Sequence, residues 1–367
     1  MQSSKKIILF GGSFDPVHFG HTKILKKAMD IVQPDKVLVL PNFQTPLKDR
    51  VLTPGAERLA MLKLAFKNWP LVEVSDYEIA QNQKCYTIDT LEHFQEIYTD
   101  HEFYILLGSD QMVSFKQWKR YDELYKKAKI ICYKRQHYCK CCRTNTCLCD
   151  TPVRDFQDII YLKEELVELS STEIRKEPLK PYSLNVDVLN YINDHGLYAI
   201  ERIQQFEKES RFKHSLRVGY MAKQLMQAVK PEWAHLAYSA GIYHDICKDM
   251  PLDLQVDIAE NILGITDYVS PKVLHGYIGA YKLKAEYGFS NDLVLDAIRR
   301  HTKPFDYYET EPTLLDKVVY LADKLEPNRT DEDVCGDIEY FRALAKQDID
   351  KCFVELFEHT QRAFNRK

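Results

Sequence analysis

Two histidines, three residues apart, follow a glycine-rich turn near the start of the chain. Residues 11–21 read GGSFDPVHFGH and come directly after the apolar stretch KKIILF. Glycines let backbone amides approach a phosphate closely, and a helix that begins here adds free N–H groups. His18 and His21 are spaced to share one helix face, where both can donate hydrogen bonds to phosphate oxygens. A role limited to capping the turn does not require this pair, so the string predicts a phosphate-binding site.

A second set of chemically capable residues is spread over the other half of the chain. It combines imidazoles and carboxylates without thiolates: His214, His244, Asp245, His275, His301 and Asp323. Any one of these histidines alone is most simply a hydrogen-bonded core residue, but the ordered set is typical of a metal centre for Fe, Mn, Co or Zn. Six ligands exceed the needs of one tetrahedral ion with an open position. We therefore expect one or two divalent ions, bridged by Asp245 as a catalytic ligand and suited to phosphoester cleavage.

The first site must be positioned by strands that alternate with helices. Apolar runs predict strands, and helical spacing predicts a helix over His21–Val32, with others between the later strands. Such alternation predicts a parallel, Rossmann-like α/β sheet covered on both faces. The strands are expected at Lys5–Phe10, Asp35–Leu40, Leu71–Val74, Glu102–Leu107, Lys129–Tyr133 and Asp158–Leu162.

The second site must be positioned by helices alone. From about Glu201 onwards helical periodicity dominates, which predicts an all-α domain. A helix that ends at Gly196 marks the junction, so we expect domains at 1–198 and 199–367. The expected helices are His214–Val229, Pro231–Tyr243, Pro271–Tyr287, Asn291–Arg300, Thr313–Asp323 and Asp348–Phe364.

Length favours two domains, and composition is that of an ordinary soluble protein. The chain has 367 residues, of which 45% are hydrophobic and 28% charged, and a net charge of −4. This charge gives no polyanion-binding signature, so we expect no nucleic-acid partner. No apolar run approaches the roughly 18 residues of a membrane span. The four-residue stretch IILF is too short for an export signal, which predicts a cytoplasmic protein. The oligomeric state is left open.

The first half resembles the bacterial nicotinate-nucleotide adenylyltransferases of the nucleotidylyltransferase superfamily, over about residues 5–198. His18-Phe19-Gly20-His21 matches the superfamily's (H/T)xGH, SSTEIR at 170–175 matches the family's SSTxIR, and YTIDTL at 86–91 also matches. Gly108-Ser109-Asp110 matches its GxD, and Trp118 its aromatic platform. The close competitor, pantetheine-phosphate adenylyltransferase, shares the first motif, but YTIDTL and SSTEIR favour the nicotinate enzyme.

The resemblance implies transfer of AMP from Mg²⁺-bound ATP to nicotinate mononucleotide, which gives deamido-NAD and pyrophosphate. Thr87 and Trp118 would lie by the pyridine ring, where an aromatic plate suits a pyridinium. Catalysis would use His18, His21, Lys48 and Arg175. ATP would be bound by Gly12, Ser13, Phe14, His18, His21, Gly108, Asp110, Ser171, Thr172 and Arg175.

One loop departs from the family pattern. The usual PNxxPPHK reads PNFQTPLK here, so Thr45 and Leu47 replace a proline and a histidine while Lys48 is kept. The departure puts the geometry of this loop, and any role of the missing histidine, in doubt. It also leaves open an inactive N-terminal half, against which the intact His18, His21 and Arg175 argue.

The second half resembles the bacterial HD-type symmetrical diadenosine tetraphosphate hydrolases, over about residues 203–365. The strings that carry the resemblance are RFKHSLRV, YHDICKDMP, HTKP and YLADKLEPNR. It implies that diadenosine tetraphosphate (Ap4A), or a related nucleotide, is split to two ADP by a metal-activated water. Lys248 and Arg329 would contact phosphate. The alternative is a nucleotide-binding regulatory module without turnover, but the complete ligand set favours a hydrolase.

A cysteine cluster belongs to neither site. Two interpretations stay open: a structural Zn²⁺ site, although the spacing matches no standard zinc module, or a loop of reduced thiols. The cluster consists of Cys139, Cys141, Cys142, Cys147 and Cys149. The five other cysteines are isolated, and each is expected to be a small core residue.

Overall fold

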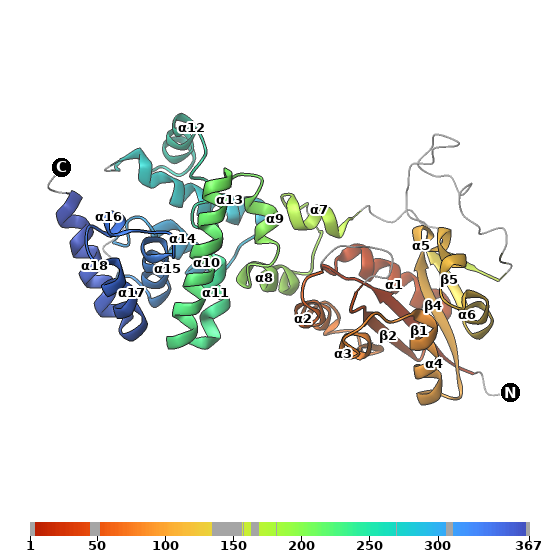
Figure 1. The fold of residues 1–367 in the computed structure, drawn as a ribbon. Helices are drawn as coiled ribbons and strands as arrows, with labels where there is room; N and C mark the ends of the chain where they lie inside the picture. Colours follow the sequence, from red (N-terminus) through yellow and green to blue (C-terminus); the bar gives the residue numbers. More distant parts are fainter. Residues whose placement is uncertain are drawn as a thin grey trace. The chain divides into compact units, whose positions relative to one another are not determined.

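The structure, a computed structural model, separates into two compact units (Figure 1). It describes residues 4–44, 52–133, 156, 158–162, 169–180, 182–268, 270–305 and 311–364. The first unit comprises Met1–Ile174 and Lys180–Val188, and the second comprises Arg175–Leu179 and Leu189–Lys367. A functional boundary at residue 198 stays a prediction.

The described strands of the first unit form one parallel sheet, as the sequence predicted. The strand order is β3-β2-β1-β4-β5-β6, and every neighbouring pair is parallel. The order reverses at β1, so the sheet has a switch point between β1 and β4. The strands are β1 (Lys5–Gly12), β2 (Lys36–Pro41), β3 (Val72–Val74), β4 (His101–Gly108), β5 (Lys129–Tyr133) and β6 (Ile160–Leu162).

Both faces of this sheet are buried. Ile7 and Leu9 of β1 pack in one core cluster with Ile88 of α4 and Leu124 of α6. Ile8 is equally buried and must point to the opposite face because side chains alternate along a strand. The helices are α1 (Phe19–Val32), α2 (Gly55–Phe66), α3 (Tyr77–Ala80), α4 (Thr87–Ile97), α5 (Ser109–Val113), η1 (Phe115–Gln117), α6 (Tyr121–Lys127), α7 (Ser171–Lys176) and α8 (Val186–Asp194), with α7 and α8 continuing into the second unit.

The second unit is helical throughout its described residues, which confirms the predicted all-α class. Two expected helices begin later than predicted, because Pro231 and Pro271 open short 3₁₀ turns before the α-helices. The elements are α9 (Ala199–Ile203), α10 (Glu209–Val229), η3 (Pro231–Trp233), α11 (Ala234–Tyr243), α12 (Leu252–Asp257), the π-helical η4 (Ile258–Ile262), η5 (Pro271–Val273), α13 (Leu274–Tyr287), α14 (Asp292–Arg300), α15 (Leu314–Leu325), α16 (Asp331–Val334), α17 (Ile338–Gln347) and α18 (Ile349–Phe364).

Glycines let the helices that carry the predicted metal ligands approach closely. A Cβ on Gly241 of α11 would lie 3.0 Å from the Cα of Gly219 on α10. A Cβ on Gly276 of α13 would lie 2.8 Å from the carbonyl oxygen of Arg299 on α14. The 2.8 Å distance excludes any side chain at position 276, and the 3.0 Å distance leaves a side chain at position 241 only an unusually tight contact, so both glycines help to set the spacing of the helix pairs.

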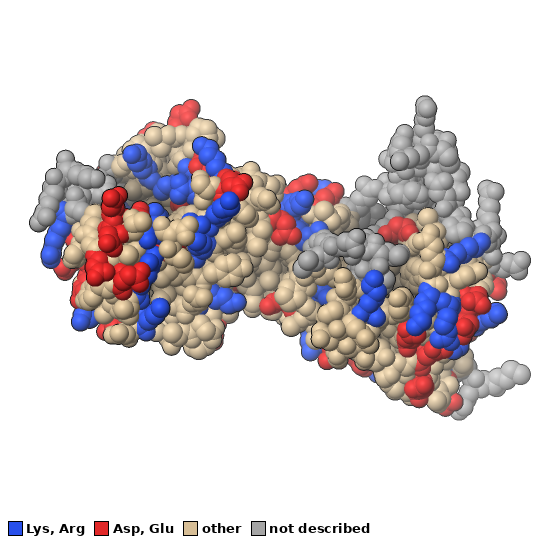
Figure 2. All heavy atoms as spheres, in the orientation of Figure 1, with Lys and Arg blue, Asp and Glu red and all other residues tan. Residues whose placement is uncertain are grey.

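The remaining features of the fold are its charged surface and the burial of its cysteines. Figure 2 shows acidic and basic side chains interspersed over the drawn face of both units. No helix in the described part of the chain has the length and apolar character needed to cross a bilayer. Cys132, Cys247 and Cys352 are buried as expected and Cys85 is partly buried, but the prediction was wrong for Cys335, which is exposed. That residue ends α16 in the left-handed region, with φ of 54°, outside the core.

Candidate active sites

The His-x-x-His string lies at the start of α1, directly after the central strand β1. His18 is the N-cap of α1 and His21 its third residue, and both side chains are at least nine-tenths buried. Their ring centroids are 3.8 Å apart. A Cβ on Gly20 would lie 2.8 Å from the His18 ring, so glycine is required for this close approach.

His21 caps the helix as well as facing the site. The His18 backbone N–H donates to Nδ1 of His21 at 3.2 Å, as a capping-box side chain would accept it. Since Nδ1 is an acceptor, the neutral ring carries its proton on Nε2 and can donate it to a ligand oxygen. The plain structural role that the sequence suggested is therefore present, and it orients the second ring nitrogen.

The predicted ATP-binding turn is closed by contacts on both sides. Phe14 has a backbone φ of 48°, and the centroid of its ring lies 5.1 Å from that of the His21 ring. The Ser171 hydroxyl, at the start of α7, donates to the Pro16 carbonyl at 3.0 Å. Ser171, from the SSTEIR string, thus lies beside the first motif although 155 residues separate it from Pro16.

A second turn meets the same edge of the sheet from β4. Gly12 ends β1 and Gly108 ends β4, and these two strands are neighbours in the parallel sheet. A Cβ on Gly108 would lie 2.3 Å from a carboxylate oxygen of Asp110, so the Gly-x-Asp turn depends on this glycine. Ligands of open α/β sheets bind at this kind of switch point.

The segments of Thr87 and Trp118 are held side by side. Thr87 is the first residue of α4, and Trp118 follows η1 and packs on Phe115. Lys119 connects them because its ammonium pairs with Asp89 at 2.9 Å and lies 4.8 Å from the Tyr86 ring centroid. Both Thr87 and Trp118 keep part of their surface exposed.

Arg175 and Thr172, both predicted to bind ATP, lie on α7. Arg175 belongs to the second unit, where its Nε lies 3.6 Å from a Glu201 carboxylate oxygen. Thr172 is exposed on α7. Lys48, with Thr45 and Leu47, lies outside the described residues, as does the cysteine cluster at 139–149. Their roles stay predictions.

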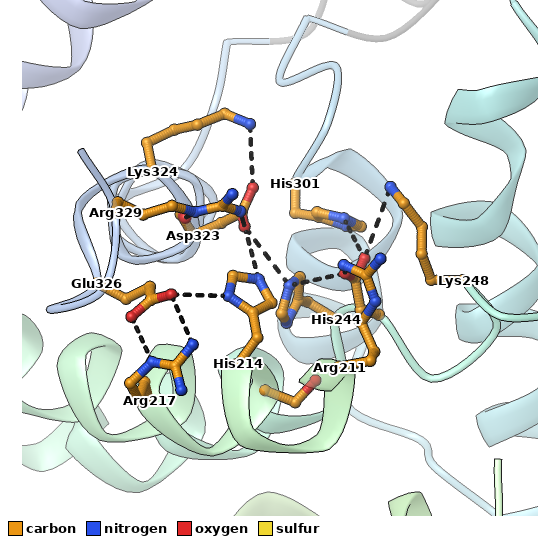
Figure 3. A network of polar contacts seen from close by, with 12 residues as sticks. Arg211, His214, Arg217, His244, Lys248, His301, Asp323, Lys324, Glu326 and Arg329 are labelled. Carbon is orange, nitrogen blue, oxygen red and sulfur yellow. Dashed lines mark hydrogen bonds and ion pairs between the residues drawn. The ribbon is translucent and has the colours of Figure 1, made fainter. Parts of the chain in front are cut away.

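All six predicted metal ligands of the second unit converge, and Figure 3 labels four of them: His214, His244, His301 and Asp323. His214 comes from α10, His275 from α13 and Asp323 from α15, while His244 and His301 are the C-caps of α11 and α14. Two overlapping groups have ligand atoms within 4.8 Å of one another: His214, His244 and Asp323, and His244, Asp245 and His301. The fourth imidazole, His275, places Nε2 3.0 Å from an Asp245 oxygen.

Three of the imidazoles have one nitrogen committed to the backbone. Nδ1 of His244 lies 2.7 Å from the Gly241 carbonyl oxygen. Nδ1 of His301 lies 2.7 Å from the Ile298 carbonyl oxygen, and Nδ1 of His275 lies 2.9 Å from that of Lys272. A carbonyl only accepts, so each Nδ1 carries the proton and each Nε2 presents a lone pair. Nδ1–H donation that leaves Nε2 free is the usual arrangement of a metal-binding histidine.

The two oxygens of Asp245 face different histidines. Oδ2 lies 3.5 Å from Nε2 of His244, whereas Oδ1 lies 3.0 Å from His275 and 3.4 Å from His301. Asp323 reaches 3.0 Å from Nε2 of His214 and 3.8 Å from that of His244. Both carboxylates therefore approach Nε2 of His244.

The electrostatics favour the protonation states that a cation needs. Burial lowers the pKa of His244 to about 3 and that of His275 to about 4, so both rings are neutral at pH 7. Burial opposes ionisation of the Asp245 carboxyl, but its pKa lies well below the usual range, and the Arg211 guanidinium donates to the carboxylate at 2.7 Å. Neutral imidazoles with ionised carboxylates are the ligand forms that bind divalent metals.

The donor set fits a divalent metal. Nε2 of His244 is buried and has no hydrogen-bond partner among the described residues, although the ligand atoms of His214 and Asp323 converge on it. A buried polar atom without a partner is costly, and a cation would satisfy it. Nitrogen and oxygen ligands suit Fe, Mn, Co or Zn rather than a soft thiolate-seeking ion.

The two predicted phosphate contacts border this cluster. The Lys248 ammonium lies 3.0 Å from Nε2 of His275 and 3.9 Å from Asp245, and burial lowers its pKa. The Arg329 guanidinium donates to the Asp323 carboxylate at 2.8 Å and to its carbonyl at 2.9 Å. Arg329 therefore orients a predicted ligand, and its contact with phosphate stays a prediction.

Sequence reasoning missed four charged residues around the cluster. Arg211 donates to Asp245 at 2.7 Å, and Lys324 pairs with Asp323 at 3.1 Å. Glu326 accepts from His214 and, through two hydrogen bonds, from Arg217. Spacing could have found three of these residues, because side chains three apart lie on one helix face. Arg211 and Arg217 are each three residues from His214. Glu326 follows Asp323 by three residues.

Comparison with known proteins agrees with this division. Residues 9–177 match the cytidylyltransferase-like family, and residues 211–328 match the HD domain. Fold and sites together define a nucleotidyltransferase-type α/β unit joined to a helical HD unit that can bind a divalent metal.

Relatives over nearly the whole length narrow the assignment. A probable nicotinate-nucleotide adenylyltransferase/Ap4A hydrolase of Mycoplasma genitalium is 36% identical over 97% of this chain and 98% of its own length. A protein of the same name from Mycoplasma pneumoniae is 35% identical over 93% of this chain and 95% of its own. A probable nicotinate-nucleotide adenylyltransferase of Aquifex aeolicus is 36% identical over 45% of this chain and 99% of its own. The chain belongs to the family of two-domain nicotinate-nucleotide adenylyltransferase/Ap4A hydrolases.

Proposed function

We propose that the chain is bifunctional. The first unit transfers AMP from ATP to nicotinate mononucleotide, and the second hydrolyses Ap4A, or a related nucleotide, to two ADP. The observation that carries the proposal is the pairing, in one chain, of a His-x-x-His turn at a sheet switch point with six converging imidazole and carboxylate ligands. The names of the two full-length relatives support the combination.

The transfer needs positioning rather than a covalent enzyme intermediate. A 5′-phosphate oxygen of nicotinate mononucleotide forms a bond to the α-phosphorus of ATP. The bond from that phosphorus to the bridging oxygen breaks, and pyrophosphate leaves with the electron pair. Catalysis then rests on alignment and charge stabilisation. We assign His18 to the α-phosphate, and we assign His21, Lys48 and Arg175 to the triphosphate, with Mg²⁺ bound to ATP.

The pyridine ring would lie between Thr87 and Trp118. The salt bridge between Lys119 and Asp89 keeps the segments of these two residues together. An aromatic face attracts a pyridinium, which is present in both the acid and the amide mononucleotide. Free N–H groups at the start of α4 favour the carboxylate of the acid, because helix N-termini attract anions. We therefore expect nicotinate mononucleotide to be preferred over its amide.

In the second unit, His214, His244, Asp245, His275, His301 and Asp323 would hold one or two divalent ions, Fe being our first expectation and Mn, Co or Zn the alternatives. A cation held there stabilises negative charge as a phosphoester is cleaved. Lys248 and Arg329 would hold the polyphosphate, and Arg329 also orients Asp323. We place the protein in the cytoplasm.

Product analysis of the purified protein tests both halves. With ATP and nicotinate mononucleotide we expect deamido-NAD and pyrophosphate, and with Ap4A plus each metal in turn we expect two ADP. Phosphopantetheine and nicotinamide mononucleotide serve as competing acceptors. Equal kcat/KM for the acid and the amide, or a preference for phosphopantetheine, would contradict the first assignment. Nucleotide binding without turnover at any metal would leave the second unit a regulatory module.

A further inference from the structure

Among the carboxylates of the described residues, only Glu326 is hydrogen-bonded to Nδ1 of a predicted metal-binding histidine. It lies at the C-cap of α15, three residues after Asp323, and is 2% exposed. Its Oε1 is 3.1 Å from Nδ1 of His214 (Figure 3). The three other histidines instead donate Nδ1–H to backbone carbonyls. His214 therefore differs from them in the charge of its partner.

The Glu326 carboxylate is itself held in place. Arg217 donates to both of its oxygens, at 2.5 Å from Nε and 3.0 Å from Nη2, and the Asn328 backbone N–H donates at 2.8 Å. Arg342 donates to the Glu326 carbonyl at 2.7 Å and to the Leu325 carbonyl at 3.0 Å, which ties the end of α15. The carboxylate is thus buried, charge-balanced and unable to swing away from His214.

His214 has a carboxylate oxygen at each ring nitrogen, Glu326 at 3.1 Å from Nδ1 and Asp323 at 3.0 Å from Nε2. Asp323 belongs to the first group of possible metal ligands, whereas Glu326 does not. With a cation bound between Nε2 and Asp323, the proton of His214 would be held on Nδ1 by Glu326, which only accepts when ionised. A carboxylate partner also makes the ring a stronger donor to a metal than a carbonyl does.

We infer that Glu326 is a positioning residue of the metal centre, which fixes the tautomer and orientation of His214 and strengthens its binding to the ion. The inference rests on the proposed metal-dependent function of this unit. Arg217 acts one step further out by holding Glu326 in place. Neither side chain needs to touch substrate in this role.

Co²⁺ titration of the full chain tests the inference, because the visible spectrum of bound Co²⁺ reports its ligands directly. We expect Glu326→Ala to weaken Co²⁺ binding about 10- to 100-fold, the usual cost of losing such a partner, and to change the spectrum. Glu326→Gln keeps an acceptor for Nδ1–H and should recover part of the affinity. Arg217→Gln should shift affinity in the same direction by less.

Asp337→Ala is the matched control. Asp337 caps α17 through the Tyr340 N–H, so its loss costs about 1 kcal/mol of stability without a described contact to any ligand. A stability effect alone would therefore appear in this control, which should keep the wild-type affinity and spectrum. Unchanged Co²⁺ affinity and spectrum in folded Glu326→Ala would overturn the inference.

The failure of the proposed hydrolysis would look different. A wild-type protein that binds Co²⁺, with the expected loss in Glu326→Ala, but cleaves no Ap4A would support the positioning role and contradict the substrate. A wild-type protein that binds no Co²⁺ would overturn the positioning role together with the metal site.

Discussion

His21 of the first site and His244 of the second are each held by a backbone hydrogen bond at Nδ1, but in opposite senses. His21 accepts a backbone N–H on Nδ1, which leaves a donor on Nε2. His244 instead donates from Nδ1 to a carbonyl, which leaves an acceptor on Nε2. The opposite tautomers suit opposite ligands, since phosphate oxygens accept hydrogen bonds and metals accept lone pairs.

The first residue-scale prediction concerns His18. In His18→Ala a donor is lost where negative charge develops on the α-phosphate, so kcat for adenylyl transfer should fall by roughly 10²–10³. The KM values for ATP and nicotinate mononucleotide should change much less, because the donor acts mainly in the transition state. Steady-state kinetics check this, and a variant within a few-fold of the wild-type kcat would disprove the assigned role.

The second concerns Glu207, whose buried carboxyl accepts a hydrogen bond from the Ser215 hydroxyl at 3.0 Å. Burial raises its pKa to about 8 from an ordinary value of 4.5. The folded protein therefore holds a proton that the unfolded chain has lost, so stability falls as pH rises from about 4.5 to about 8 and then levels off. We expect the ionisation of Glu207 alone to lower the free energy of unfolding by on the order of a few kcal/mol between these two pH values.

Glu207→Gln should remove this part of the pH dependence. Melting temperatures should be measured from pH 5 to pH 9 in the presence of a chelator. We expect the melting temperature of Glu207→Gln to rise relative to that of the wild type as the pH increases. Glu209→Gln is the control two residues further along, at the start of α10, because Glu209 is exposed and pairs with Lys213. Parallel pH profiles for wild type and Glu207→Gln would show that the carboxyl is already ionised at neutral pH.

At the scale of elements, local sequence patterns predict much of the architecture, and the architecture in turn predicts where the sites lie. Short apolar runs and helical spacing predicted the six strands and the main helices, because those signals are local. The edge of the sheet at Gly12 and Gly108 follows from parallel topology. Contacts between distant segments were not predictable: Arg217 and Glu326 are 109 residues apart, and no periodicity encodes their pairing.

Arg58 of α2 is a second such contact and supports the turns at the sheet edge. Its side chain is 1% exposed and donates to the carbonyls of Thr53 at 2.8 Å, Ser13 at 2.9 Å and Phe43 at 3.4 Å. Ser13 and Phe43 follow β1 and β2 at the carboxyl edge. One guanidinium therefore ties the glycine-rich turn to the next loop.

We predict that Arg58→Lys loosens both turns, because a single ammonium cannot reach three diverging carbonyls. Unsatisfied buried carbonyls should destabilise the first unit by about 1–3 kcal/mol. Misplaced phosphate-binding groups should lower kcat/KM for adenylyl transfer roughly 10- to 100-fold. Lys63→Gln, on an exposed position of the same helix, is the control. Wild-type kcat/KM in Arg58→Lys would mean that the turns hold their geometry without it.

At the scale of the whole molecule, each predicted site is built mainly from one unit. His18, His21, Gly108 and Asp110 belong to the first unit, whereas the six predicted metal ligands belong to the second. Arg175 is the exception, because it is assigned to the triphosphate but lies in the second unit. The two chemistries should therefore be separable by mutation at the metal cluster, where Arg175 takes no part.

Asp245→Ala tests that separation most directly. Asp245 faces His244 with one oxygen and His275 and His301 with the other, so its loss removes the ligand best placed to bridge two ions. Without the carboxylate the repulsion between two cations is unscreened, and metal content and Ap4A hydrolysis should fall together. Adenylyl transfer should stay within a few-fold of wild type, because it uses Mg²⁺ that arrives with ATP.

Metal analysis and both assays on the same preparation decide the matter. Asp249→Ala is the matched control, since Asp249 lies four residues later and accepts only the Lys208 N–H in the described contacts. Persistent Ap4A cleavage or unchanged metal content in Asp245→Ala would disprove the hydrolase assignment. A folded Asp245→Ala protein that loses both activities would instead show that the state of the metal cluster reaches the adenylyltransferase site, and Arg175 on α7 would be the first residue to mutate in search of the connection.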